Sequence, residues 1–187
     1  MPRERSRQGR PAYPEHRLSI LSRLFNARTS RQPYIPLYTA VVAEARRPFW
    51  YAEGGAPDTL DGRFDMVAAV MALVLIRMEA DGEAGREPAA RLTELFVDDM
   101  DGQLRQQGVG DVVVGKHVGR MMAALGGRIA AYRDGLAGGD LEGALVRNLW
   151  RGQPPAIGAG IIAAGMRALA DRLAGLSLGQ LLEGRLS

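Results

Sequence analysis

The sequence predicts an all-α protein, built as a single compact multi-helix domain without a sheet. Apolar residues recur at a spacing close to 3.6 residues in every long segment, as on the buried face of a helix. Glycine or proline divides these segments at intervals that suit helices. No segment alternates apolar and polar residues as a half-buried strand would. With 187 residues and 47% hydrophobic content, one domain can bury a core of useful size.

The composition argues against most kinds of enzyme. The chain has no cysteine, which removes disulfides, zinc–thiolate sites and thiol nucleophiles. It has two histidines, and no serine lies between Arg31 and Leu176, so neither a metal cluster nor a serine nucleophile is supported. We therefore expect no catalytic residue, no cofactor, no metal ion and no specific DNA contact.

Positive charge is concentrated at the start of the chain. Residues 1–31 carry eight arginines and two glutamates, whereas the remainder is mildly acidic. We expect residues 1–13 to be a disordered basic arm and residues 14–187 to form the helical domain. The arm arginines are Arg3, Arg5, Arg7 and Arg10.

A short amphipathic helix is expected at about 14–26, and its role stays open. It could dock on the domain, or the arm could touch the ribosome or an anionic inner-membrane surface. No apolar core of a secretory signal precedes residue 18, so we expect a bacterial cytoplasmic protein, with peripheral membrane contact as the alternative.

The next elements are a helix at about 37–46, stopped by Pro48, and a long helix at about 60–80. Asp58, Thr59 or Asp61 can cap the long helix. It is apolar nearly all round from residue 66 to 76, so it should be the central buried helix. This run of 11 residues is too short to cross a membrane.

Two further helices, at about 86–107 and 113–134, should form a hairpin. The first has an apolar stripe that includes Phe96 and Met100, and Asp99 falls on that inner side. A buried carboxylate needs a cation or several donors, and Arg63 is the favoured partner. Acidic residues of the first helix should face basic residues of the second. The charged hairpin surface comprises Asp98, Asp101, Arg105, Lys116 and Arg120.

The chain should end in three more helices. The first, at about 140–151, is capped by Asp140 and carries Asn148 on its apolar face, where the amide needs partners. The other two are a segment at about 156–174 and a short helix capped by Ser177.

Two motifs resemble known ligand-binding sites but lack features that those sites require. Residues 110–116, GDVVVGK, fit the spacing of a phosphate-binding loop, but no strand precedes them and a histidine follows the lysine. Asp98, Asp99 and Asp101 lack the spacing that would put three carboxylates on one face, and Asp101 is placed to pair with Arg105 instead.

Four segments resemble the ubiquinol–cytochrome c chaperone family, the assembly factors for cytochrome b of the bc1 complex. They are FVDDMDGQLRQQGVGDVVVGK (96–116), YTAVVAEARRPFWYAEGGAPDT (38–59), LDGRFDMV (60–67) and LVRNLW (145–150). Together they cover roughly residues 35–150. The resemblance implies an all-α, non-enzymatic chaperone that engages newly made cytochrome b. In mitochondria the family acts beside the ribosomal tunnel exit, with a small partner protein. Whether this chain has such a partner subunit stays unknown.

These observations support two functional hypotheses. The first is a non-catalytic chaperone that holds cytochrome b in an apolar groove walled by Phe49, Trp50, Tyr51 and Met122. For the three aromatic residues, a corner of the core is the alternative interpretation. The second hypothesis is a helical scaffold that binds a folded soluble partner through the charged hairpin surface.

Overall fold

The computed structural model describes residues 31–106, 111–153, 155 and 158–186, except for the side chains of residues 104 and 111–118. The chain divides into two units, residues 1–32 and 33–187. The predicted basic arm, the helix at 14–26 and the boundary between residues 13 and 14 all lie outside the described residues, as do residues 107–110 of the predicted hairpin. The helices α2 to α9 belong to the second unit.

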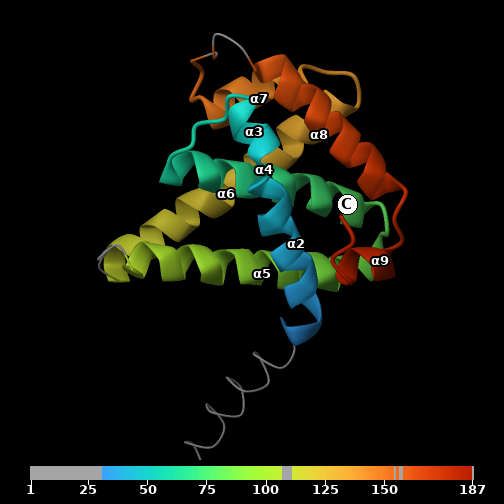
Figure 1. Cartoon of the computed structure of the whole chain (residues 1–187). Helices are drawn as coiled ribbons and strands as arrows, with labels where there is room; N and C mark the ends of the chain where they lie inside the picture. The colour runs from blue at the N-terminus through green and yellow to red at the C-terminus, as the bar shows by residue number, and fades with distance from the viewer. Residues whose placement is uncertain (1–30, 107–110, 154, 156–157, 187) are drawn as a thin grey trace, which may run out of the picture. The chain divides into compact units, whose positions relative to one another are not determined.

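The all-α prediction is confirmed for the described ranges, which contain helices and no strand (Figure 1). Each expected helix of the second unit is present, and the aromatic triplet belongs to an additional short helix, α3. The elements are the 3-10 turn η1 (Gln32–Tyr34), α2 (Ile35–Ala45), α3 (Pro48–Ala52), α4 (Leu60–Glu79), α5 (Glu83–Gln106), α6 (Asp111–Leu136), α7 (Leu141–Leu149), α8 (Ala159–Ala174) and α9 (Leu178–Leu182).

Side chains cap the helices where the sequence suggested they would. Of the three candidates before α4, Thr59 is the cap, because its hydroxyl accepts a hydrogen bond from the Gly62 amide at 3.1 Å. Asp140 accepts from the Gly143 amide in the same way. Ser177 and Gln180 form a reciprocal capping box at the start of α9. These bonds satisfy amide groups that a helix start leaves without a partner.

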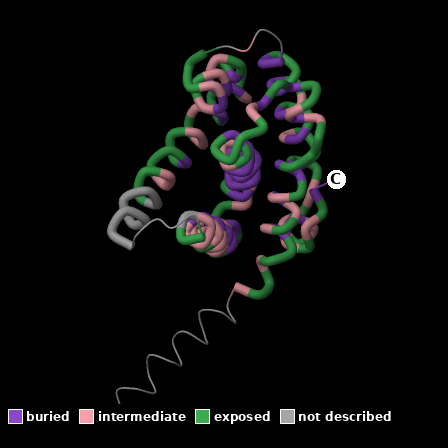
Figure 2. The backbone as a smooth tube through the Cα atoms, turned by 60° about the vertical axis from the view of Figure 1, so that its left-hand side comes forward, coloured by how far each residue is buried: buried purple, intermediate pink, exposed green. Residues whose placement is uncertain are grey.

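Helix α4 is the centre of the unit. Every residue from Met66 to Leu75 is buried, and α4 contacts α2, α5, α6, α7 and α8. Figure 2 shows this helix buried along most of its length, with exposed residues on the helices around it. Met78, next to the end of the helix, is also fully buried, because neighbouring helices cover α4 on several sides. In the part of the chain described, no helix is both long and apolar enough to cross a membrane.

Candidate functional site

Two open pockets flank the loop between α3 and α4. We call the first the Trp150 pocket; it measures about 490 Å³ and lies where the start of α4 meets the end of α7. We call the second the Tyr51 pocket; it measures about 500 Å³ and lies on the α2–α3 side of the loop. The Trp150 pocket is lined by Pro57, Thr59, Leu60, Asp61, Gly62, Asp65, Leu149, Trp150, Arg151 and Gln153. The Tyr51 pocket is lined by Arg46, Pro48, Tyr51, Ala52, Asp58 and Arg63.

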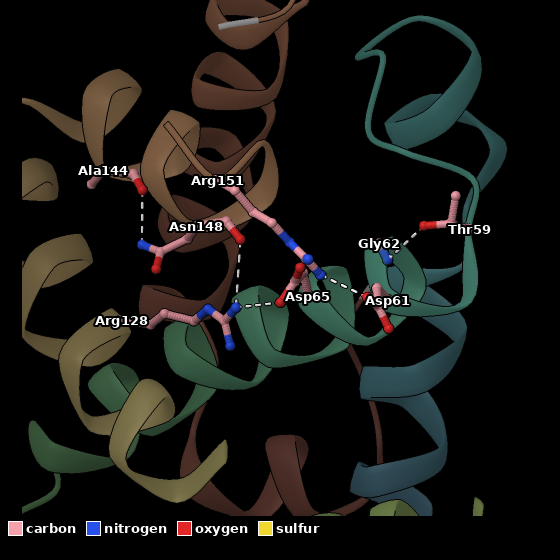
Figure 3. A network of polar contacts seen from close by, with 8 residues as sticks. All are labelled: Thr59, Asp61, Gly62, Asp65, Arg128, Ala144, Asn148 and Arg151. Carbon is pink, nitrogen blue, oxygen red and sulfur yellow. Dashed lines mark hydrogen bonds and ion pairs between the residues drawn. The ribbon is translucent and has the colours of Figure 1, made fainter. Parts of the chain in front are cut away.

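A polar network lies behind the Trp150 pocket (Figure 3). Arg128 of α6 donates to the carboxylate of Asp65, and a longer contact of 3.5 Å joins it to the Asn148 carbonyl oxygen. Burial raises the pKa of Asp65, although the nearby charges of Arg128 and Arg151 act in the opposite direction. The cost of removing this carboxylate from water is therefore only partly offset by its partners.

The Asn148 side chain has the hydrogen-bond partner that a polar group on an apolar helix face requires. Its side-chain amide donates to the Ala144 carbonyl oxygen, one turn back in α7, at 2.8 Å. This local bond lets a polar side chain sit among the apolar residues of the helix face.

Arg151 closes one side of the Trp150 pocket. It follows the end of α7 and has φ +55°, the left-handed conformation that glycine usually supplies after a helix end. Its guanidinium donates to Asp61 at 2.6 Å, across 90 residues of sequence. Both side chains are mostly exposed, at 72% and 67%. An arginine in this strained backbone position brings a cation directly onto a carboxylate of the pocket.

Tyr132 of α6 lies in the core beside this network. Its hydroxyl is buried near Asn148 and Arg128, but neither forms a hydrogen bond of regular geometry with it. Burial raises the pKa of Tyr132 to about 12.

The four predicted groove residues do not all line one pocket, although Phe49 and Trp50 together line a small one of about 160 Å³ beside α8. Trp50 is 1% exposed and donates its indole N–H to the Glu44 carbonyl oxygen at 2.8 Å, so it belongs to the core. Phe49 packs edge-on against it, with ring centroids 5.1 Å apart. Tyr51 lines the Tyr51 pocket and donates to the Ala45 carbonyl oxygen. Met122 is half-buried against the core and lines neither the Tyr51 pocket nor the Trp150 pocket.

The predicted pair of Asp99 and Arg63 is wrong. Arg63 is exposed and donates to Asp58 at 2.6 Å, because it lies in the first turn of α4 beside the preceding loop. Asp99 does face inward, half-buried, and accepts from the Tyr38 hydroxyl at 2.7 Å and from Gln103 at 3.0 Å. Burial and this hydrogen bond raise the pKa of Tyr38. Neutral donors thus take the place of the expected cation.

Two basic residues of α6 pair with the central helix α4. Among the described side chains of α6, Arg128 and Arg133 pair with Asp65 and Glu79 of α4 rather than with α5. On α5, Asp101 pairs with Arg105 at 2.7 Å, as its spacing predicted. Asp98 and Arg120 are exposed, and the Lys116 side chain lies outside the described residues.

Reasoning from sequence missed most of this site. It did not single out Asp61 and Asp65, whose spacing of four residues should have placed both carboxylates on one face of α4. The partners Arg128 and Arg151 carry no local signal, because only the packing of α6 and α7 on α4 brings them there. Asn148 and Arg63, which were singled out, lie at the margins of the site.

Comparison with known proteins gives two matches. A family model described as "Ubiquinol-cytochrome C chaperone" matches residues 52–187. A solved structure, "Crystal structure of the Cbp3 homolog from Brucella abortus", is similar to this chain with 29% sequence identity and a TM-score of 0.74. The similarity covers 91% of this chain and 94% of that one. No curated protein matches.

Proposed function

Because this chain belongs to the ubiquinol–cytochrome c chaperone family, and is thus a non-catalytic factor in assembly of the bc1 complex, we propose that its client is newly made cytochrome b. The client would be held before the complex is complete and released without chemical change.

The observation that carries this proposal is the position of the two pockets. Three of the four sequence segments that resemble the family, residues 38–59, 60–67 and 145–150, supply all of the lining residues except Arg151 and Gln153. The linings of both pockets combine apolar and charged side chains. Such a surface suits transient binding of a membrane protein segment, which offers apolar side chains bordered by polar ones.

Leu60 gives this surface an exposed apolar contact. It lines the Trp150 pocket and is 49% exposed, whereas most large apolar side chains of α4 are buried. An exposed leucine alone would carry no meaning. At the mouth of a pocket with apolar walls it is a suitable anchor for a client.

The test has two levels. Deletion of the gene should lower bc1 activity and haem-bearing cytochrome b, and an affinity-tagged chain should recover cytochrome b from the deleted strain. Normal bc1 assembly in the deletion strain would refute the proposal. Recovery of a soluble partner in place of cytochrome b, lost on charge reversal at Asp101, would support the scaffold alternative.

Point variants then locate the client surface. Leu60→Glu should reduce recovery of cytochrome b by placing a charge at the pocket mouth. Ile161→Glu is the matched control, since Ile161 is also a large exposed apolar residue, at 39%, and lines neither the Trp150 pocket nor the Tyr51 pocket. Equal effects of the two changes would place client binding elsewhere on the molecule.

A further inference from the structure

We propose that the Trp150 pocket binds a lysine or arginine side chain of the client, taken from the basic flank of a membrane-spanning segment. This inference rests on the proposed function and deepens it by naming the chemical feature that is recognised.

The lining of the pocket matches both parts of a long basic side chain. Leu60, Leu149 and Trp150 provide apolar surface for its aliphatic stem. Asp61 and Asp65 provide carboxylates for its charged end. Each carboxylate is paired with an arginine, Asp61 with Arg151 and Asp65 with Arg128, so a client cation would bind by exchange with the exposed Arg151.

Arg151 already shows which group the pocket accepts. Its guanidinium lies on Asp61 and acts as an internal substitute for the client's cation (Figure 3). The pair is exposed, so exchanging this cation for another costs little. The left-handed backbone of Arg151 adds strain at the same place, and nothing in the helix end requires arginine rather than glycine there.

Asp65 adds attraction from the inner side of the pocket. It is held by Arg128, and burial raises its pKa because Arg128 and Arg151 offset the cost of desolvation only in part. A second cation at the mouth of the pocket would stabilise the ionised form.

The chemistry of membrane proteins identifies the source of such a cation. Loops on the cytoplasmic side carry an excess of lysine and arginine next to apolar spans. A chaperone that binds an apolar side chain together with an adjacent cation would therefore select the ends of these spans.

The test uses the full-length chain and two labelled peptides. One has an apolar stretch of about ten residues with lysines at its end, like the end of an apolar span with its basic flank. The other has glutamates in place of the lysines. Fluorescence anisotropy at low salt measures the Kd of each. The wild-type chain should prefer the lysine peptide, and added salt should reduce that preference.

Variants separate the proposed site from general charge effects. Asp61→Asn should weaken binding of the lysine peptide on the order of fivefold, because one charge pair is lost. Arg151→Gly should strengthen it, because the internal competitor is removed. The control is Glu183→Gln, which removes a carboxylate of similar exposure, 59% against 67% for Asp61, paired with Arg185 at 2.8 Å and outside both pockets. It should leave the Kd unchanged.

Three outcomes would overturn the inference. The lysine peptide could bind no better than the glutamate peptide, or not at all. Asp61→Asn could act no more strongly than Glu183→Gln. The glutamate peptide could be preferred and then lost in Arg151→Gly, which would assign an acidic ligand to Arg151. If cytochrome b is still recovered from cells in any of these cases, the proposed function stands and only this inference fails.

Discussion

Arg128 of α6 and Asp65 of α4 form an ion pair that is mostly shielded from water, with side chains 11% and 18% exposed. A second pair, Arg133 with Glu79, joins the same two helices but is about half exposed, at 49% and 51%. The two ion pairs therefore join the same two helices but differ in how far they are buried.

Arg128→Ala should lower the free energy of unfolding by about 2 to 4 kcal/mol, because it leaves Asp65 shielded and without its cation. Arg133→Ala should cost under about 1 kcal/mol, since water replaces an exposed partner. Urea unfolding of both variants measures the difference. If the two variants unfold alike, the Arg128 pair is not shielded in solution.

The Asp65 carboxyl should also leave a pH signature. Its pKa in the fold is raised by burial, so the folded chain binds the proton more readily than the unfolded chain does. Protonation therefore stabilises the fold, and this contribution is lost as pH rises from the ordinary aspartate range through the raised pKa.

Asp65→Asn provides the reference for this effect, because an amide does not titrate. The free energy of unfolding of the wild-type chain minus that of Asp65→Asn should fall as pH rises through this window and then become constant. Chemical unfolding at several pH values measures it. A difference that increases with pH would mean that the pKa of Asp65 is lowered in the fold.

Tyr132→Phe should leave the stability unchanged or raise it, since the variant removes a buried hydroxyl that forms no hydrogen bond of regular geometry with its neighbours Asn148 and Arg128. Tyr38→Phe is the control and should cost about 1 to 2 kcal/mol, because Asp99 loses a hydrogen bond of 2.7 Å. Thermal melts of both variants measure these changes in stability. Equal losses would show that the Tyr132 hydroxyl is hydrogen-bonded in solution.

The contrast between Asp99 and Asp61 shows what sequence could predict. Helical periodicity correctly placed Asp99 on the inner face, because that depends on spacing along one helix. The same reasoning chose the wrong partner, since Tyr38 reaches Asp99 only through the packing of α2 on α5. The helices and their caps depend on local signals and were predicted well. The Trp150 pocket depends on contacts across some 90 residues, which no local pattern encodes.

Gly62 links the fold to the proposed client surface. It lies in the first turn of α4 and lines the Trp150 pocket, and its amide donates to the Thr59 cap. A methyl group added at this position would overlap the backbone carbonyl of Pro57. Since backbone atoms cannot move aside as a flexible side chain can, Gly62→Ala should displace the α3–α4 loop and cost about 1 to 3 kcal/mol.

Gly126→Ala provides the control for this change. Gly126 is exposed within α6, and an added methyl group would meet nothing within 4 Å. Alanine is the better helix former, so this variant should gain about 0.5 to 1 kcal/mol. Thermal melts measure the stability of each variant, and recovery of cytochrome b measures its binding of the client. We expect Gly62→Ala to reduce both, and Gly126→Ala to raise the melting temperature without affecting recovery. If Gly62→Ala recovers as much cytochrome b as the wild-type chain, the position of the α3–α4 loop does not matter for the client.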